Sequence, residues 1–153
     1  IPMTQAKDIM TREVVTVQET LSVRELAKIL SDNHISGAPV VDIQGALIGV
    51  VTENDLIDQA KKVHIPTVMA FFDSFVFLEN PERLEKDLKK MAAATVGDIC
   101  SREVVTVTPE TPLDELATMM AEKKIHTLPV VEGERLVGVI GKSDIIRTLA
   151  QGA

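Results

Sequence analysis

Residues 37–56 read GAPVVDIQGALIGVVTENDL, and residues 127–145 read TLPVVEGERLVGVIGKSDI. Each stretch contains two short apolar runs separated by a glycine-containing turn, and a polar segment typical of a helix start follows. Apolar runs joined in this way predict a β-hairpin. The runs are continuously apolar rather than alternating, which indicates strands that are covered on both faces. One strand–turn–strand–helix pattern therefore occurs twice in the chain.

The duplication extends to the segments that precede the hairpins. Residues 12–17 read REVVTV, and the same six residues recur 90 positions later at 102–107. Their apolar parts, Val14–Val17 and Val104–Val107, predict short strands, and an apolar face with helical spacing i, i+3, i+4, i+7 follows each of them. The face consists of Val23, Leu26, Ala27 and Leu30 in the first copy and of Leu113, Leu116, Ala117 and Met120 in the second. The chain is therefore expected to contain two βαββα units.

Helix-start signals agree with this reading. Ser22 with Glu25 forms a capping-box pattern, and Thr111 before Pro112 is typical of an N-cap followed by the first helical residue. A unit of about 50 residues buries its apolar surface poorly by itself. We therefore expect the two copies to pack against each other.

The copies cover residues 6–60 and 96–150, and residues 61–95 form an insert between them. All four phenylalanines lie in the insert, at Phe71, Phe72, Phe75 and Phe77. The sequence after Asn80 predicts a helix. One interpretation is a linker that covers the hairpins or a dimer seam, and the other is a lid or a partner-binding surface.

Composition excludes several classes of function. The net charge is −7 and no basic stripe is present, so nucleic acid is not an expected partner. The most apolar stretch, Val68–Leu78, contains Asp73 and is shorter than the roughly 20 apolar residues of a membrane helix. The single cysteine, Cys100, excludes an internal disulfide and suits a reducing compartment. With no secretory signal pattern, we expect a cytoplasmic location.

The sequence contains no recognisable catalytic motif. No His, Cys or acidic cluster has metal-ligand spacing, and no nucleophile–base pair can be read from the chain. Neither a phosphate-binding P-loop nor a dinucleotide fingerprint is present. We therefore expect no catalytic residue, no metal, no cofactor and no enzymatic activity. His34 is expected to end a helix.

Polar residues at the strand-to-helix step are the best candidates for ligand binding. A helix N-terminus suits a phosphate, and a carboxylate there, such as Asp55, is able to accept two ribose hydroxyls. The small residues Gly37, Ala38 and Pro39 expose backbone to which a flat ring could hydrogen-bond. The alternative is structural, with Thr52 as a helix cap and Asp55 favoured by the helix dipole. The residues alone leave both interpretations open.

The ordered set of motifs, given twice, resembles a tandem pair of CBS domains, the regulatory repeat known from cystathionine β-synthase. The resemblance covers residues 6–60 and 96–150. It implies an α/β (α+β) fold in which two pseudo-symmetric βαββα repeats pack sheet to sheet, with a helical insert between them. It also implies a homodimer and two clefts that bind AMP, ADP, ATP or S-adenosylmethionine.

The resemblance also implies which positions line the clefts, with an aspartate in each cleft holding the ribose. In the first copy these positions are Thr16, Gly37, Ala38, Pro39, Thr52 and Asp55. In the second copy they are Thr106, Thr127, Leu128, Pro129 and Asp144.

The second copy departs from the family pattern. Gly141 stands where a hydroxyl residue is expected, but His126 and Lys142 add cationic groups where the first copy has Ser36 and Glu53. The structural alternative makes His126 an exposed edge residue and Lys142 a solvated helix-start lysine. If both contact ligand, the clefts are unequal, and the one with Asp144 takes the more phosphorylated ligand. The other cleft then takes a less anionic adenosyl ligand or stays empty.

The sequence thus predicts a regulatory module that senses an adenosine-type ligand and is read by a protein partner. A ligand-independent dimerisation or protein-interaction module is the alternative, and Gly141 is the residue that favours it.

Overall fold

The computed structural model describes residues 4–62 and 94–152. The first part contains α1 (Ala6–Ile9), β1 (Val17–Gln18), α2 (Val23–Asp32), β2 (Gly37–Val41), β3 (Leu47–Thr52) and α3 (Glu53–Lys62). The second part contains α6 (Val96–Ile99), α7 (Leu113–Lys123), β4 (Thr127–Glu132), β5 (Arg135–Gly141) and α8 (Lys142–Ala150). The four phenylalanines of the expected insert, and its expected helix, lie outside the described residues.

Both predicted hairpins are confirmed. Strand β2 pairs with β3, and β4 pairs with β5, in antiparallel register. The turns contain Gly45 at φ +86° and Gly133 at φ +65°, a backbone conformation that favours glycine. Strand β1 adds to the first hairpin by parallel pairing with β2, whereas Val107 makes a single parallel bridge to Val130 in the second.

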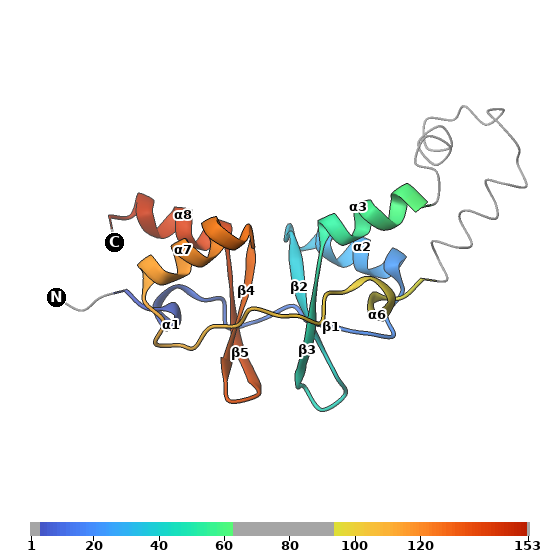
Figure 1. The fold of residues 1–153 in the computed structure, drawn as a ribbon, viewed down its shortest axis with the longest axis horizontal. Coiled ribbons are helices and arrows are strands. Elements are labelled where there is room, and N and C mark those ends of the chain that lie inside the picture. The colour runs from blue at the N-terminus through green and yellow to red at the C-terminus, as the bar shows by residue number, and fades with distance from the viewer. Residues whose placement is uncertain (1–3, 63–93, 153) are drawn as a thin grey trace, which may run out of the picture.

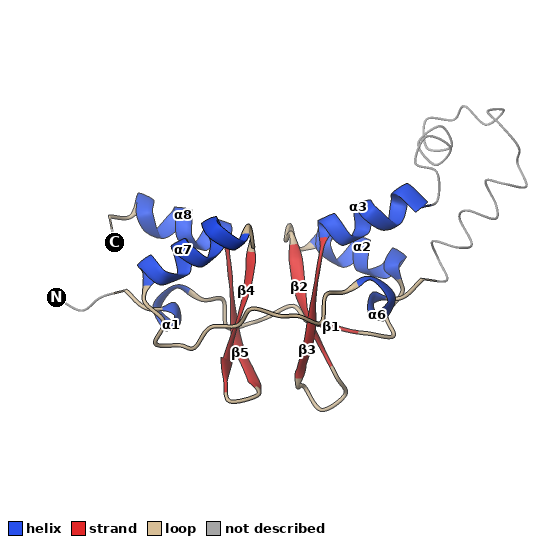
Figure 2. Ribbon diagram, viewed as in Figure 1, coloured by secondary structure: helices blue, strands red, loops and turns tan. Residues whose placement is uncertain are grey.

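The two sheets stand side by side in the middle of the molecule, and the long helices lie to their outer sides (Figures 1 and 2). Gly37 of β2 lies against the side chain of Thr127 of β4. At the other end of the strands, Ala46 forms an antiparallel bridge with Arg135. This arrangement is the pseudo-symmetric, sheet-to-sheet α/β fold predicted from the sequence.

One of the two predicted helix starts is confirmed and the other is shifted. The Ser22 hydroxyl accepts the backbone N–H of Glu25 at 3.1 Å, as a helix cap does. The prediction for Thr111 was wrong, because α7 begins at Leu113 and Pro112 is its extended cap residue. The Thr111 hydroxyl instead accepts the N–H of Thr108 at 3.1 Å in the preceding turn.

Each hydrophobic core is completed by the short first helix of the other copy. Val96 of α6 is buried with Leu26 and Val40 of the first repeat. Ala6 of α1 is buried with Leu116 and other apolar residues of the second repeat. Figure 1 shows α1 beside α7 and α8, and α6 beside α2. The two repeats therefore exchange their first helices.

This exchange shortens the expected first strands. Thr11 pairs with Val139 of β5 through two backbone hydrogen bonds of 2.9 and 3.0 Å, and Ser101 pairs with Val50 in the same way. The chain must then cross from one repeat to the other before it joins its own sheet. As a result, the runs at 14–17 and 104–107 contribute only Val17, the first residue of β1, and the single bridge of Val107.

Candidate ligand-binding site

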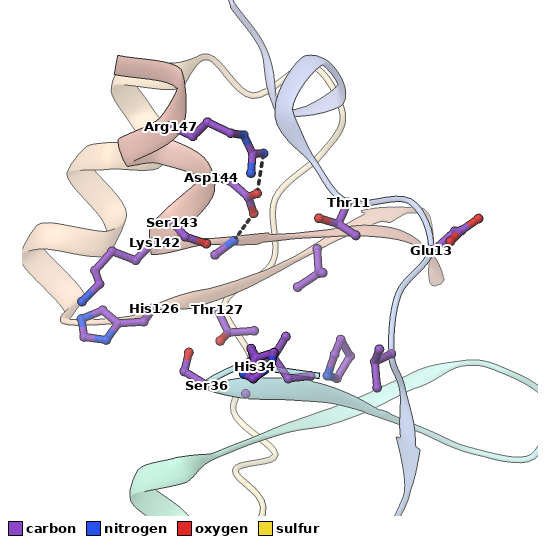
Figure 3. Close-up of a pocket in the computed structure, with 16 residues that line it drawn as sticks. Thr11, Glu13, His34, Ser36, His126, Thr127, Lys142, Ser143, Asp144 and Arg147 are labelled. Carbon is purple, nitrogen blue, oxygen red and sulfur yellow. Dashed lines mark hydrogen bonds and ion pairs between the residues drawn. The ribbon is translucent and has the colours of Figure 1, made fainter. Parts of the chain in front are cut away.

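A cavity of about 460 Å³ lies between the two repeats (Figure 3). Pockets of roughly 300–1,000 Å³ are the usual size for small-molecule ligands. It is lined by both repeats and by residues 11–16, which lead from α1 to β1 and are called the crossing segment below. The lining residues are Thr11, Glu13, Val15, His34, Ile35, Ser36, Gly37, Pro39, His126, Thr127, Val139, Gly141, Lys142, Ser143, Asp144 and Arg147. A ligand in this cavity would therefore contact both repeats at once.

The close approach of the two sheets at the cavity depends on a glycine. A β carbon added to Gly37 would stand 2.8 Å from the Thr127 hydroxyl and 3.1 Å from the backbone oxygen of Val51. Gly37 and Thr127 occupy corresponding positions in the two copies. One side chain therefore fills the space in which two would collide.

Asp144 presents a nearly buried carboxylate to the cavity at the start of α8. Its Oδ2 accepts the backbone N–H of Gly141 at 2.7 Å, and its Oδ1 accepts a hydrogen bond from Arg147 at 2.8 Å. The residue is 7% exposed. Through Oδ2 the Asp144 side chain thus caps the start of α8. A carboxylate has about four acceptor positions, so capping leaves room for a ligand.

Asp55 caps α3 in the same manner in the first repeat. Its Oδ2 accepts the N–H of Thr52 at 2.8 Å and the Thr52 hydroxyl at 3.2 Å. Gly141 replaces Thr52 in the second repeat, so only the backbone contact is repeated there. In the first repeat the Thr52 hydroxyl therefore contacts Asp55, and the second repeat has no such contact to Asp144 because Gly141 has no hydroxyl.

Cationic groups gather at one end of the cavity. Lys142 is the first residue of α8, and its N–H donates to the backbone oxygen of His126 at 3.3 Å. In Figure 3 the Lys142 and His126 side chains lie at the same end of the cavity. A helix N-terminus favours negative charge, and contacts between charged groups are stronger than neutral ones. This end of the cavity is suited to an anion.

Comparison with known proteins agrees with the fold. The family model for the CBS domain matches residues 6–62 and 96–151. The chain belongs to the CBS domain family. It is 28% identical over 151 residues to the uncharacterized protein MJ1426 of Methanocaldococcus jannaschii, which covers 94% of this chain and 89% of that protein.

Two solved structures of CBS pairs resemble the chain and contain adenosine compounds. The CBS domain pair of protein MJ0100, in complex with 5′-methylthioadenosine and S-adenosyl-L-methionine, has a TM-score of 0.72 and 27% identity, covering 99% of this chain and 100% of that one. CBSX2 in complex with AMP has a TM-score of 0.72 and 25% identity, covering 96% of both chains.

Other relatives are longer than the chain. It matches L-aspartate semialdehyde sulfurtransferase of M. jannaschii with 29% identity over 95% of this chain but only 23% of that enzyme. It spans 58% of the chloroplastic protein CBSX1 of Arabidopsis thaliana. A CBS pair of this kind therefore occurs within proteins of different sizes.

The cavity of this CBS pair brings together half of the residues expected from the sequence. These are Ser36, Gly37, Pro39, His126, Thr127, Lys142 and Asp144. The remaining expected residues do not line it: Thr16, Ala38, Thr52, Asp55, Thr106, Leu128 and Pro129. Among them, Ala38 and Leu128 are fully buried within the two repeats, and Thr16 and Thr106 are exposed. The grouping also differs from expectation, because Gly37 and Pro39 of the first copy lie with Asp144.

Several cavity residues were not expected. Thr11, Glu13 and Val15 reach it because the crossing segment runs between the repeats, an arrangement that no local pattern indicates. His34 follows the end of α2 in a left-handed conformation, at φ +54°, and lines the cavity. Arg147 was detectable in principle, since it lies one helical turn after Asp144 on the same face.

The described residues offer binding groups rather than a metal centre. Within residues 4–62 and 94–152, no group of three His, Cys, Asp or Glu side chains is placed to hold a metal ion. In the same ranges, none of the helices combines the length and apolar character needed to cross a membrane.

Proposed function

We propose that this CBS pair is a cytoplasmic regulatory module that binds an adenosine-type ligand in the cavity at Asp144. The observation that carries the proposal is the cavity itself, which both repeats line and which holds a nearly buried carboxylate beside a cationic helix start. The adenosine compounds bound to two similar CBS pairs support it.

The cavity offers a complementary group for each part of a nucleotide. The remaining acceptor positions of Asp144 would receive the two ribose hydroxyls. The Lys142 and His126 side chains, with the positive end of the α8 dipole, would attract a phosphate. The half-buried side chains of Val15, Ile35 and Val139 provide apolar surface for the base.

The two repeats should differ in the charge of the ligand that they accept. The first two turns of α3 and α8 differ in charge at two corresponding positions, where Glu53 and Asp58 of α3 stand in place of Lys142 and Arg147 of α8. Asp55 and Asp144 correspond and carry the same charge. A phosphate is therefore repelled at the start of α3 and attracted at the start of α8. We assign the more phosphorylated ligand to the Asp144 cavity and a less anionic adenosyl ligand, or none, to the region of Asp55.

Regulation follows if the ligand binds one relative arrangement of the repeats better than another. A ligand shifts a conformational equilibrium only by its difference in affinity for the two states. The cavity is lined by α8 of one repeat, by β2 of the other and by the crossing segment, so a bound ligand restrains all three. A protein partner would read the resulting change in geometry.

Thermal melting with adenosine, AMP, ADP, ATP, S-adenosylmethionine and 5′-methylthioadenosine tests the proposal. A ligand at 100 times its Kd stabilises the folded state by about 2.7 kcal/mol. We expect a clear increase in Tm with at least one compound, and loss of that increase in Asp144→Ala. Asp98→Ala is the matched control, because Asp98 caps α6 through the N–H of Thr95 at 2.9 Å but does not line the cavity. No Tm change with any compound would contradict the proposal.

A second candidate function is association between copies of the chain. Three large apolar residues are exposed on the final helices of the two repeats: Ile57 is 51%, Ile146 58% and Leu149 59% exposed. We propose that these helices form a homodimer interface. Sedimentation velocity should show a monomer for Ile57→Lys/Ile146→Lys and a dimer for wild type. Ile43→Lys is the control, because Ile43 is 88% exposed in the β2–β3 turn.

A further inference from the structure

Arg147 holds the carboxylate that faces the cavity. Its guanidinium donates to Asp144 Oδ1 at 2.8 Å from the next turn of α8. The Asp144 side chain is 10% exposed and that of Arg147 is 57% exposed, so the cation closes the solvent side of a nearly buried anion. In the first repeat the corresponding residue of α3 is Asp58, which has the opposite charge.

The two hydrogen bonds fix how the carboxylate is presented. Oδ2 is held by the N–H of Gly141 and Oδ1 by Arg147, one donor on each oxygen. About four acceptor positions are available on a carboxylate, so one position on each oxygen remains. This arrangement suits two adjacent hydroxyls, because each would find its own oxygen on a carboxylate whose plane is fixed.

We infer that Arg147 is a positioning residue for the ribose diol, acting through Asp144. This inference rests on the proposed function, since it concerns the same cavity. It assigns no phosphate contact to Arg147. Lys142 begins α8 and Arg147 lies five residues later, which is about 7.5 Å along the helix axis. Figure 3 accordingly shows Lys142 with His126 at one end of the cavity and Arg147 away from them.

Four probes separate recognition of the diol from recognition of the phosphate. Isothermal titration calorimetry would give Kd values for adenosine, 2′,3′-dideoxyadenosine and the 5′-monophosphates of both. Two ratios follow from these Kd values. The diol ratio is the Kd of the dideoxy compound divided by that of the compound with both hydroxyls, and the phosphate ratio is the Kd of the nucleoside divided by that of its monophosphate. Hydrogen bonds to a charged group predict a diol ratio of roughly tenfold or more in wild type.

Arg147→Gln should lower the diol ratio by about two- to fivefold, the range expected for a partly exposed ion pair, and leave the phosphate ratio unchanged. Arg147→Lys should restore part of the diol ratio, because lysine keeps the positive charge. The restoration should be incomplete, because the ammonium lacks the planar geometry of the guanidinium. Lys142→Gln is the matched control and should have the opposite signature, with a lower phosphate ratio and an unchanged diol ratio.

The outcomes distinguish the inference from the proposed function. Wild-type protein that binds none of the four probes overturns both. Binding with an unchanged diol ratio in Arg147→Gln overturns only the role of Arg147. A fall in the phosphate ratio of Arg147→Gln also overturns it and makes Arg147 a direct anion contact. An equal loss of affinity for all four probes assigns Arg147 a merely structural role.

Discussion

Gly49 and Ser101 lie against each other although they belong to different repeats. A β carbon added to Gly49 would stand 2.7 Å from the backbone oxygen of Ser101. The neighbouring Val50 exchanges two backbone hydrogen bonds with Ser101, at 3.0 and 2.9 Å. The exchange of first helices therefore depends on a position without a side chain, where the segment that follows α6 reaches β3.

Alanine at the two corresponding glycines should have unequal effects on stability. Gly49→Ala meets backbone, which cannot rotate away, and should lower the free energy of unfolding by about 2 kcal/mol. Gly138→Ala meets the side chain of Met10, at 2.5 Å from its sulfur, and should cost about 1 kcal/mol or less because methionine adapts. Urea denaturation of both variants checks this order. Equal losses would mean that the backbone at Ser101 yields as easily as the Met10 side chain.

Acid should weaken the start of α6 through Asp98. Hydrogen bonds from the backbone N–H of Thr95, and then from its hydroxyl, hold the pKa of the Asp98 carboxyl below its ordinary value. A lowered pKa in the folded state stabilises the protein above the unfolded pKa of about 4, and this contribution is lost as pH falls through the folded value. The stability gap between wild type and Asp98→Asn should therefore narrow below about pH 4. Urea midpoints measured from pH 7 to pH 3 test this, and a constant gap would rule it out.

The elements that local patterns specify were predicted well. Both hairpins follow from apolar runs around Gly45 and Gly133, and the cap of α2 follows from Ser22. Arrangements that depend on residues far apart in sequence were not predicted. The crossing of Thr11 to Val139 joins segments with no shared local signal, so the shortened first strands and the cavity contacts of the crossing segment were missed.

The candidate site shows the same division. The sequence singled out Asp144, His126 and Lys142, and these three residues line one cavity. The full set of lining residues was not predicted, because it depends on how the two hairpins face each other. The prediction grouped the residues of each copy together, whereas the cavity combines Gly37 and Pro39 of the first repeat with Asp144 of the second.

The Gly37–Thr127 contact predicts a compensating pair of substitutions. Gly37→Thr places a second side chain against the Thr127 hydroxyl, and we expect a loss of about 1–3 kcal/mol from overpacking. Gly37→Thr combined with Thr127→Gly exchanges the two residues and should recover part of this loss. A double-mutant cycle by urea denaturation measures the coupling, which is expected to be at least about 0.5 kcal/mol for residues in contact. Additive effects would show that Gly37 is limited by Val51 and Thr52 instead.

The cationic end of the cavity predicts a salt-sensitive preference for phosphate. Lys142→Gln removes a charge at the start of α8 and should weaken AMP binding by about 1 kcal/mol, or roughly fivefold in Kd. Lys124→Gln is the control, because Lys124 is an exposed lysine that ends α7 without lining the cavity. The loss in Lys142→Gln should shrink as the salt concentration rises, since ions screen an exposed charge within about 10 Å at 0.1 M. Calorimetry with AMP and adenosine at low and high salt measures both effects. Equal weakening of AMP binding by the two substitutions would mean that the overall electrostatic field of the protein, rather than a contact at the helix start, attracts the phosphate.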